Sequence, residues 1–385
     1  MKFVLSGVET NNKGAELMLY AILQEIERKY PDSKVYVGLD SVQQGLDYIH
    51  TSLELCEKPV YYTRKWFQRM HLYGIARRLH IHVPTKWFQD RYAIKGTDYF
   101  IDGSGFAFSD QWNIPEWLIE QKTKLWEANA SVGAKLIFLP QALGPFTKEY
   151  SRRQLSVIAK YASVIMPREK QSYQYIQESG LVDMEKVWKF ADFTSLVKGT
   201  VPSQYEYLRD SVCVIPNLRM IDKGAITMEG YVKLLSSIIK NAKAHGHNVF
   251  LLNHEGKGDE ELAYKLKDAL SGDIAVFTGL NALEVKGLIS ISYLVISSRF
   301  HGVASALNSC VPCLATSWSF KYAELFNDYK LDGCILPLDD PNLAISMIEK
   351  YLDPHVNESI RNHLIEQRPH IQQNTREMWD LIWNL

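Results

Sequence analysis

The sequence lacks several features that would place it in a specialised class of protein. It has no run of about 18 consecutive apolar residues, so we expect no membrane-spanning helix. Its formal net charge is −1, which argues against a surface dominated by nucleic-acid binding. Its first residues, MKFVLSGVETNNKGAE, become polar too soon for a signal peptide, and we expect a cytoplasmic location.

Cysteine is also scarce. The chain has five cysteines, and the pair Cys310 and Cys313 lacks the second pair that a zinc site would need. We therefore expect reduced cysteines in packed cores and no bound metal. The remaining composition is typical of a soluble globular protein: 46% of the residues are hydrophobic and 23% are charged, over 385 residues that suit two domains.

Short apolar strands alternate with amphipathic helices along the chain. A first series of strands is predicted within residues 2–6, 34–39, 98–105, 134–141 and 162–169. A second series is predicted within residues 211–219, 248–255, 273–279, 293–302, 313–318 and 334–340. Buried, β-branched strands that alternate with helices favour parallel sheets, so we expect two Rossmann-like α/β domains.

The boundary between the two series falls in residues 197–207, which show no periodicity and contain Gly199 and Pro202. We predict an N-terminal domain over residues 1–198 and a C-terminal domain over residues 208–355. A C-terminal helix is predicted over residues 356–385.

Residues 61–95 interrupt the first domain with many Arg, Lys, Trp, Phe and Tyr side chains and one acid, Asp90. Two interpretations stay open. The segment is either a helical insertion whose aromatic rings pack and whose charges face water, or a surface for an anionic amphiphile such as a membrane-bound, lipid-linked substrate. The second interpretation adds peripheral contact with the inner face of the membrane.

Cationic side chains gather where the predicted strands end, which is where open parallel sheets bind ligands. They are Arg168, Arg219, Arg299, His254 and His301. Arginine binds phosphate and carboxylate through paired N–H donors, so this pattern predicts an anionic ligand, although a strand-end arginine serves equally well as a partner for a structural carboxylate. Arg299 beside His301 is the most informative feature, because burying two such groups without a partner is costly.

Several short motifs follow the predicted strands in a fixed order. They are Gly14-Ala15-Glu16, Asp102-Gly103-Ser104-Gly105, Leu139-Pro140-Gln141 with Gly144-Pro145, Arg168-Glu169 with Ser172, and Ser298-Arg299-Phe300-His301-Gly302 with Pro312 and Lys321. Together with Asp192 and the stretch from His254 to Asp259, they resemble the polysaccharide pyruvyl transferase family. The sequence departs from the family pattern at Ala15, where an acid is usual, at Ser104, where glycine is usual, and at Phe300, where leucine is usual.

The resemblance implies a GT-B-like fold, in which two facing Rossmann-like domains border a cleft and a C-terminal helix crosses back to the first domain. Trp379, Ile382 and Trp383 would form the packing face of that helix. It also implies the reaction: the pyruvyl group of phosphoenolpyruvate is transferred to two hydroxyls of a sugar as a cyclic ketal, with release of phosphate, in the biosynthesis of surface polysaccharides or exopolysaccharides.

For this reaction we predict His301 as the general acid. The donor anion is assigned to Arg168, Arg219, Ser298, Arg299 and Lys321. The remaining strand-end positions are assigned to the acceptor and the cleft: Asn12, Gly14, Glu16, Gly103, Gly105, Asp110, Gln141, Asn217, His254 and Glu255. Glu16 and Asp110 are candidate bases. Phosphoenolpyruvate is a co-substrate, so no cofactor is expected.

Two other functions stay open. A glycosyltransferase that uses a nucleotide sugar would have the same fold and a cationic cleft, and a non-catalytic sugar-binding protein would have the fold without the chemistry. The sequence also leaves the acceptor open among a lipid-linked intermediate, a free glycan and a nucleotide sugar.

Overall fold

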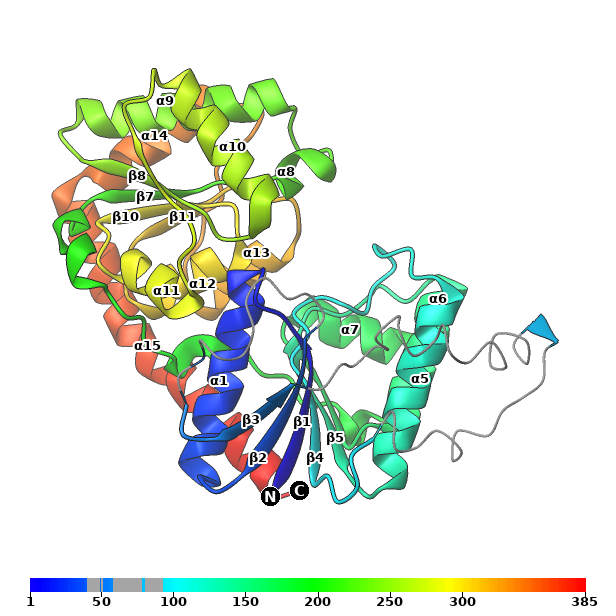
Figure 1. Ribbon diagram of the computed structural model, residues 1–385. Helices are drawn as coiled ribbons and strands as arrows, with labels where there is room; N and C mark the ends of the chain where they lie inside the picture. The colour runs from blue at the N-terminus through cyan, green and yellow to red at the C-terminus, as the bar shows by residue number, and fades with distance from the viewer. Residues whose placement is uncertain (40–48, 50, 58–77, 80–92) are drawn as a thin grey trace. The chain divides into compact units, whose positions relative to one another are not determined.

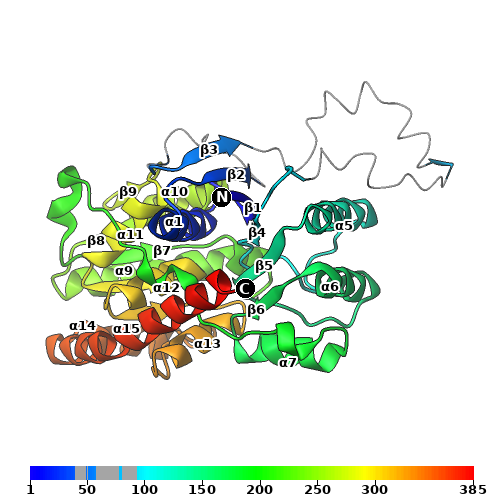
Figure 2. The same ribbon diagram turned by 90° about the horizontal axis from the view of Figure 1, so that it is seen from below.

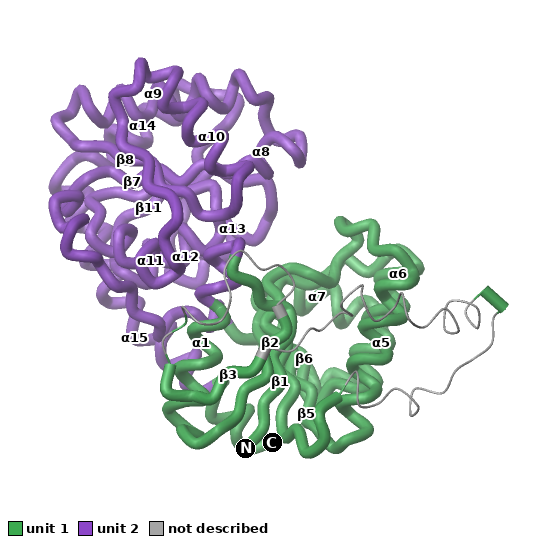
Figure 3. The backbone as a smooth tube through the Cα atoms, viewed as in Figure 1, with its two compact units in different colours: residues 1–10, 18–190, 378–385 green, residues 11–17, 191–377 purple. Residues whose placement is uncertain are grey.

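The computed structural model describes residues 1–39, 49, 51–57, 78–79 and 93–385 (Figures 1 and 2). Most of the basic and aromatic segment 61–95 lies outside these residues, so its contact with a membrane stays a prediction. Within the part of the chain that is described, no helix is long and apolar enough to span a bilayer. The chain forms two compact units, which are coloured separately in Figure 3.

Unit 1 comprises residues 1–10, 18–190 and 378–385, and unit 2 comprises residues 11–17 and 191–377. Residues 197–207, where we predicted the linker, lie within unit 2. Residues 11–17 also belong to unit 2, although they follow the first strand of unit 1 directly in sequence.

The sheet of unit 1 has six strands in the order β3-β2-β1-β4-β5-β6, and each neighbouring pair is parallel. The strands are β1 (Lys2–Val8), β2 (Lys34–Leu39), β3 (Glu54–Glu57), β4 (Tyr99–Asp102), β5 (Lys135–Gln141) and β6 (Val164–Pro167). The helices are α1 (Lys13–Lys29), which begins in unit 2, α5 (Glu116–Ser131), α6 (Glu149–Tyr161) and α7 (Lys170–Ser179), with a 3₁₀ turn η3 (Met184–Lys186). All residues of β4 and β6 are buried, as a strand covered on both faces requires.

The sheet of unit 2 has five strands in the order β11-β10-β7-β8-β9, again with parallel neighbours. The strands are β7 (Val212–Ile215), β8 (Val249–Leu252), β9 (Ala275–Phe277), β10 (Leu294–Ser297) and β11 (Cys313–Ala315). The helices are α8 (Arg219–Asp222), α9 (Met228–Ala244), α10 (Gly256–Ala269), α11 (Ala282–Ser290), α12 (Phe300–Asn308), α13 (Lys321–Asp328), α14 (Pro341–Leu352) and α15 (Pro354–Trp383), with 3₁₀ turns η4 (Phe193–Leu196) and η5 (Ser203–Leu208). In Figure 1, α9 and α14 lie on one side of this sheet and α11 and α12 on the other.

Both sheets follow the doubly wound strand order of Rossmann-like folds, and the predicted fold class is confirmed. The order reverses between β1 and β4 in unit 1 and between β7 and β10 in unit 2. Ligands of such sheets bind beyond the carboxyl ends of the strands at this switch point. The segments after β7 and β10 are therefore the first place to look for a site in unit 2.

Two strands differ from the prediction. Residues 334–340 do not form a strand and contribute only an isolated bridge between Ala315 and Ile335, because Pro337 has no N–H to continue a ladder. The edge strand β3 was not predicted. Its sequence, ELCE, places a glutamate at each end and lacks the apolar run that marks a buried strand.

The C-terminal helix α15 begins in unit 2, and its last residues belong to unit 1, as predicted. Trp379, Ile382 and Trp383 are buried. The ring of Trp383 lies edge-on to the ring of Tyr99, with centroids 5.5 Å apart, and its Nε1–H donates to Glu25 at 3.0 Å. This predicted packing face is therefore confirmed.

Candidate active site

The turn between β1 and α1 is bound to the carboxyl edge of the second sheet. The backbone N–H of Lys13 donates to the carbonyl of His254 at 3.0 Å, directly after β8. The side chain of Asn12 donates to Glu255 at 2.9 Å. The sequence placed this turn in the first domain, whereas these contacts make it part of the site of unit 2.

Glu16 links this turn to the start of α11 through its carboxylate. Its side chain is fully buried, and each carboxylate oxygen has a partner. One oxygen accepts the N–H of Ala282 at the start of α11 at 3.0 Å, and the other accepts Nζ of Lys13 at 2.6 Å. A carboxylate that is held in this way is poorly placed to take a proton from a substrate, so the geometry favours a structural role over the predicted role as a base.

Ser298 lies at the switch point, directly after β10, and is 1% exposed. Its carbonyl accepts hydrogen bonds from Asn217 and Tyr322, both at 2.7 Å. Its hydroxyl bonds to the hydroxyls of Tyr231 and Thr316. Ser298 and Asn217 therefore fix the backbone after β7 and β10, and they leave few polar atoms for the ligand we predicted them to bind.

Arg299 forms a buried ion-pair network. Its Nε and Nη2 donate to Asp259 at 2.7 and 2.6 Å, and its Nη1 donates to Glu255. Burial lowers the pKa of Arg299 to about 10 and raises the pKa of Asp259 to about 7, so each charge depends on the other for its stability. The side chain of Glu255 is the most exposed member of this network, at 21%, and is the one that an incoming anion would displace.

His301 occupies the first turn of α12 and packs between two segments of unit 2. Its Nε2 lies 3.4 Å from a carboxylate oxygen of Asp192. A Cβ atom added to Gly14 would lie 2.3 Å from its Nδ1, so the ring fills the space that the glycine leaves open. The side chain is 11% exposed. Gly14 is thus required for the position of the predicted acid.

His254 is a second imidazole at this edge, and it is 3% exposed. Its Nδ1 has no hydrogen-bond partner among the residues that the structure describes. Burial, together with the charges of Arg299, His301 and Lys13, lowers its pKa well below the ordinary value of 6.5. His254 is therefore neutral at pH 7 and can accept a proton or a hydrogen bond.

Two further cations flank this edge in different surroundings. Nζ of Lys321 lies 4.8 Å from the ring centroid of Trp318 and 5.5 Å from that of Phe300, which favours a cation in this place. Arg219 begins α8, and its half-exposed side chain pairs with Asp222 at 3.2 Å. An exposed ion pair of this kind is weak and can open to an anionic ligand.

The predicted residues of unit 1 also lie at the carboxyl edge of their sheet. The backbone N–H of Arg168 donates to the carbonyl of Gln141 at 3.0 Å. The Arg168 guanidinium and Glu169 form an ion pair at 2.7 Å, in which both side chains are 3% exposed. Ser172 donates to the same glutamate at 2.9 Å. Arg168 thus has a structural carboxylate as its partner within unit 1.

The glycine-rich turn after β4 is packed against the end of β1. The N–H of Ser104 bonds to the side chain of Asp102 at 3.1 Å, and burial raises the pKa of Asp102. Gly7 has a φ of +71°, and a Cβ atom there would clash with the Ser104 hydroxyl. A Cβ atom on Gly103 would lie 3.0 Å from the side chains of Ile22 and Val8, and the carbonyl of Gly105 accepts the N–H of Ala142 at 3.1 Å.

Asp110 fixes the start of α6. Its carboxylate accepts hydrogen bonds from the backbone and the hydroxyl of Thr147 at 2.9 and 2.6 Å, and from Ser151. Burial alone would raise the pKa of Asp110, but these hydrogen bonds, led by that of Ser151, lower it below 3.8. A carboxylate with a lowered pKa is a weak base, so the geometry favours a cap over the predicted base.

The structure therefore gathers the predicted residues into two groups. Unit 2 holds Asn12, Gly14, Glu16, Asn217, Arg219, His254, Glu255, Ser298, Arg299, His301 and Lys321, and unit 1 holds Gly103, Gly105, Asp110, Gln141 and Arg168. That the two groups meet in one cleft stays a prediction. The sequence assigned no role to Lys286, which is fully buried and has a pKa lowered to about 8 by burial.

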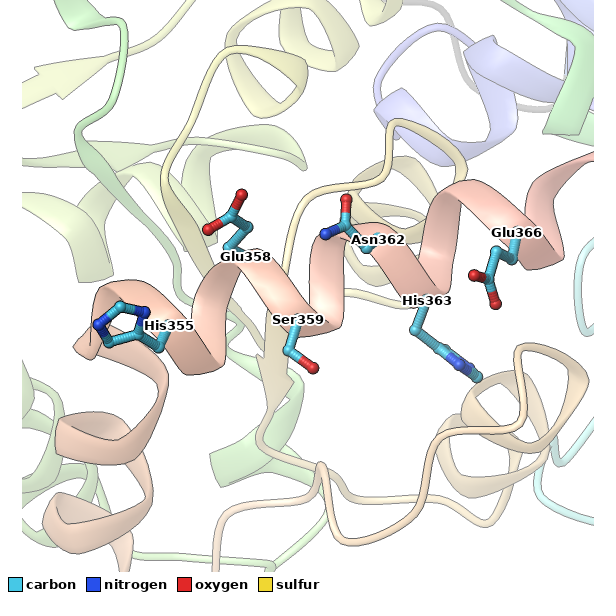
Figure 4. A pocket seen from close by; sticks show the side chains of 6 residues that line it. All are labelled: His355, Glu358, Ser359, Asn362, His363 and Glu366. Carbon is cyan, nitrogen blue, oxygen red and sulfur yellow. The ribbon is translucent and has the colours of Figure 1, made fainter.

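A pocket of about 490 Å³ lies along α15 and is lined by His355, Glu358, Ser359, Asn362, His363 and Glu366 (Figure 4). These side chains all come from one helix, and none belongs to the predicted site. Within the described ranges, no group of three or more His, Cys, Asp or Glu side chains is arranged to hold a metal ion.

Solved structures of low sequence identity share this fold. HepE of Anabaena in complex with UDP and glucose is 11% identical, with a TM-score of 0.62 and 100% of both chains covered. UDP-GlcNAc 2-epimerase of Neisseria meningitidis bound to UDP-GlcNAc is 13% identical, with a TM-score of 0.61 and 100% of both chains covered. The lipopolysaccharide outer core galactosyltransferase WaaB is 10% identical, with a TM-score of 0.51 and 100% of both chains covered. These similarities show a fold of the GT-B type and nothing of the function.

A family model gives the stronger relationship. No curated protein sequence matches the chain. The model described as polysaccharide pyruvyl transferase, a family of transferases, matches residues 12–319. This match covers most of the chain and includes both the turn at Gly14 and the segment that carries Arg299 and His301. The chain belongs to the polysaccharide pyruvyl transferase family.

Proposed function

We propose that this chain transfers the pyruvyl group of phosphoenolpyruvate to two hydroxyls of a sugar as a cyclic ketal and releases phosphate. Family membership supports a transferase, and the location of the site supports an anionic donor. The observation that carries the proposal is the group of two imidazoles, His254 and His301, beside Arg299 at the carboxyl edge of the second sheet.

The donor carries a phosphate and a carboxylate, and the cations of unit 2 are suited to both. We assign Arg299, Lys321 and Arg219 to these anions, because charged hydrogen bonds from arginine are strong and directional. Glu255 holds one nitrogen of Arg299 in the structure, so donor binding would replace this carboxylate with one from the ligand. Arg168 belongs to unit 1, and its part in donor binding stays a prediction.

The first chemical step needs an acid. A proton passes from the His301 imidazolium to the methylene carbon of phosphoenolpyruvate, which becomes a methyl group and leaves a cationic centre at the adjacent carbon. The oxygen of the first sugar hydroxyl forms a bond to that centre. A positioned acid contributes about 10²–10⁴-fold to such a step.

The hydroxyl must lose its proton as it adds, and we assign His254 to accept it. This ring is neutral, and its Nδ1 has no hydrogen-bond partner among the described residues, so it can receive the proton while the neighbouring His301 acts as the proposed acid. The bond between carbon and the phosphate oxygen then breaks, and phosphate leaves with the electron pair. The second hydroxyl adds to the same carbon, and its proton leaves with phosphate. The proton on His254 passes through solvent to His301, so both rings return to their starting forms and the reaction is balanced without a cofactor.

Calorimetric titration with phosphoenolpyruvate tests the donor. Wild type should bind it saturably, and Arg299→Lys should bind it at least about 10-fold more weakly, since charged hydrogen bonds contribute roughly 1.5–3 kcal/mol each. Arg209→Ala is the control, because Arg209 forms an exposed pair with Glu206. Arg299→Lys keeps a positive charge beside Asp259 and so limits the damage to folding.

Other outcomes of this titration would contradict the proposal. Binding of a UDP- or GDP-sugar without binding of phosphoenolpyruvate would favour a glycosyltransferase. Absence of phosphate release with a panel of lipid-linked, free and nucleotide-linked sugars, together with sugar binding, would favour a non-catalytic sugar-binding protein.

A further inference from the structure

The carboxylate of Asp192 is held in one orientation. The residue precedes the turn η4, and one of its oxygens accepts the N–H of Thr194 at 3.0 Å and also the Thr194 hydroxyl. The side chain is 5% exposed. One oxygen thus serves the backbone turn, and the other is left to face the neighbouring element.

The second oxygen faces the ring of His301, which begins α12. It lies 3.4 Å from Nε2, which is longer than an ideal charged hydrogen bond but within the range of an ion pair when the ring is protonated. The opposite nitrogen, Nδ1, lies against Gly14, where a Cβ atom would approach to 2.3 Å. The imidazole is therefore bounded on one edge by a carboxylate and on the other by a glycine of α1.

Among the residues that the structure describes, the titratable groups around this pair lie on several elements. Tyr329 follows α13, and burial together with the charge of Asp192 raises its pKa. Lys13 and Glu16 lie on α1 and pair with each other at 2.6 Å. Arg299 precedes α12, and the neutral His254 follows β8. Lys286 of α11 donates to the carbonyl of Thr194 at 3.1 Å, and the charge of Asp192 partly offsets the lowering of its pKa by burial. Lys13 and Arg299 are each paired with a carboxylate, and the carboxylate that contacts the His301 ring is that of Asp192.

We infer that Asp192 is a positioning residue for His301, which directs the Nε2–H of the ring to itself and favours the protonated form. The nitrogen that is left for proton transfer is Nδ1, on the side of Gly14. This inference rests on the proposed function for its catalytic meaning. The contact between Asp192 and His301 has a physical consequence that can be measured without any substrate.

Asp192→Asn is the informative variant. Asparagine keeps an oxygen for Thr194 but presents an uncharged amide N–H₂ to Nε2, which favours the neutral ring with its proton on Nδ1. Asp183→Asn is the matched control, since Asp183 caps the turn η3 through the N–H of Glu185 at 3.1 Å in the same way and forms no ion pair with a histidine among the residues that the structure describes.

The ¹⁵N NMR spectrum of histidine-labelled protein gives the readout, with His301→Gln used to assign the signals. We expect the pKa of His301 to be lower in Asp192→Asn than in wild type and in Asp183→Asn, and the neutral ring to change from the Nε2–H to the Nδ1–H form. With substrates, kcat should fall by about 10²-fold in Asp192→Asn and should change little in Asp183→Asn.

An unchanged pKa and tautomer of His301 in folded Asp192→Asn would overturn the inference. If that variant does not fold, the wild-type spectrum decides, because a neutral ring with its proton on Nδ1 is incompatible with Asp192 as its partner. If wild type transfers no pyruvyl group to any acceptor, the proposed function fails, while the spectra still decide whether Asp192 controls the ring.

Discussion

Replacing Gly14 with alanine is the sharpest test of the site that the structure offers. The added Cβ atom would lie 2.3 Å from Nδ1 of His301 and 2.8 Å from its Cγ. Ordinary contacts begin at about 3.4 Å, so the ring would have to move by roughly 1 Å or turn away from α1. The perturbation falls on the ring of the proposed acid and adds a single methyl group.

The expected loss follows from this displacement. A shift of about 1 Å in a reacting group costs on the order of 10²-fold in rate, so we expect kcat to fall by about that factor in Gly14→Ala. Stability should change less. Overpacking costs roughly 1–3 kcal/mol, while alanine in the first turn of α1 recovers about 1 kcal/mol of helix propensity relative to glycine.

The assay is phosphate release with phosphoenolpyruvate and a sugar acceptor, measured alongside urea unfolding. Gly230→Ala is the control, because Gly230 lies in the first turn of α9 and the nearest neighbours of its added methyl group would be Thr227 and Ile226, at 3.1 Å or more. Wild-type kcat in a well-folded Gly14→Ala variant would refute the placement of His301 as the acid. An equal loss in Gly230→Ala would show that the assay reports stability rather than the site.

Three further predictions address the base, a buried charge and the fold. His254→Gln should lower kcat by about 10²–10⁴-fold and leave the calorimetric affinity for phosphoenolpyruvate largely unchanged; a parallel loss of affinity would indicate a donor-binding residue instead. Folding lowers the pKa of Lys286 from 10.5 to about 8, so between these pH values the unfolded state binds more protons than the folded state. The free energy of unfolding should therefore increase as pH rises from about 8 to 10.5. In urea unfolding, Lys286→Met should lack this increase in the free energy of unfolding. An identical pH dependence in wild type and Lys286→Met would contradict the prediction. Trp383→Ala should destabilise unit 1 by about 3–5 kcal/mol in the same measurement, because it removes a buried ring from a packed aromatic group; a loss below 1 kcal/mol would show that the end of α15 is not anchored there.

Most strands were predictable because a strand that is covered on both faces is largely apolar. All residues of β4, β6, β7 and β10 are buried. The edge strand β3 was not predictable for the opposite reason, since an edge needs no apolar run and its sequence carries two glutamates. The pattern of apolar residues thus reveals a buried strand even at the end of a sheet, as with β6, and misses a short strand with polar ends such as β3.

Polar residues at strand ends were harder to interpret than their position suggested. The sequence correctly located Arg299, Ser298 and Asn217 beside the switch point, because the carboxyl ends of β7 and β10 are fixed by strand order. It could not separate side chains that face a ligand from side chains that hold the backbone. That distinction depends on long-range partners such as Asp259 and Tyr322, which lie far from them in sequence.

The turn at residues 11–17 also shows that local sequence does not reveal long-range contacts, here for the assignment of a segment to a domain. Its sequence follows β1 directly, and nothing local indicates that Lys13 bonds to His254 or that Glu16 bonds to the start of α11. These contacts span more than 200 residues, and they place Gly14 against His301. The turn therefore needs glycine because the second sheet supplies a ring to fill the gap. This also explains why the acid expected at position 15 can be replaced by Ala15 while the glycine and the glutamate beside it are retained. Gly14 makes room for the ring, and Glu16 bonds the turn to α11. The side chain of Ala15 takes part in neither contact.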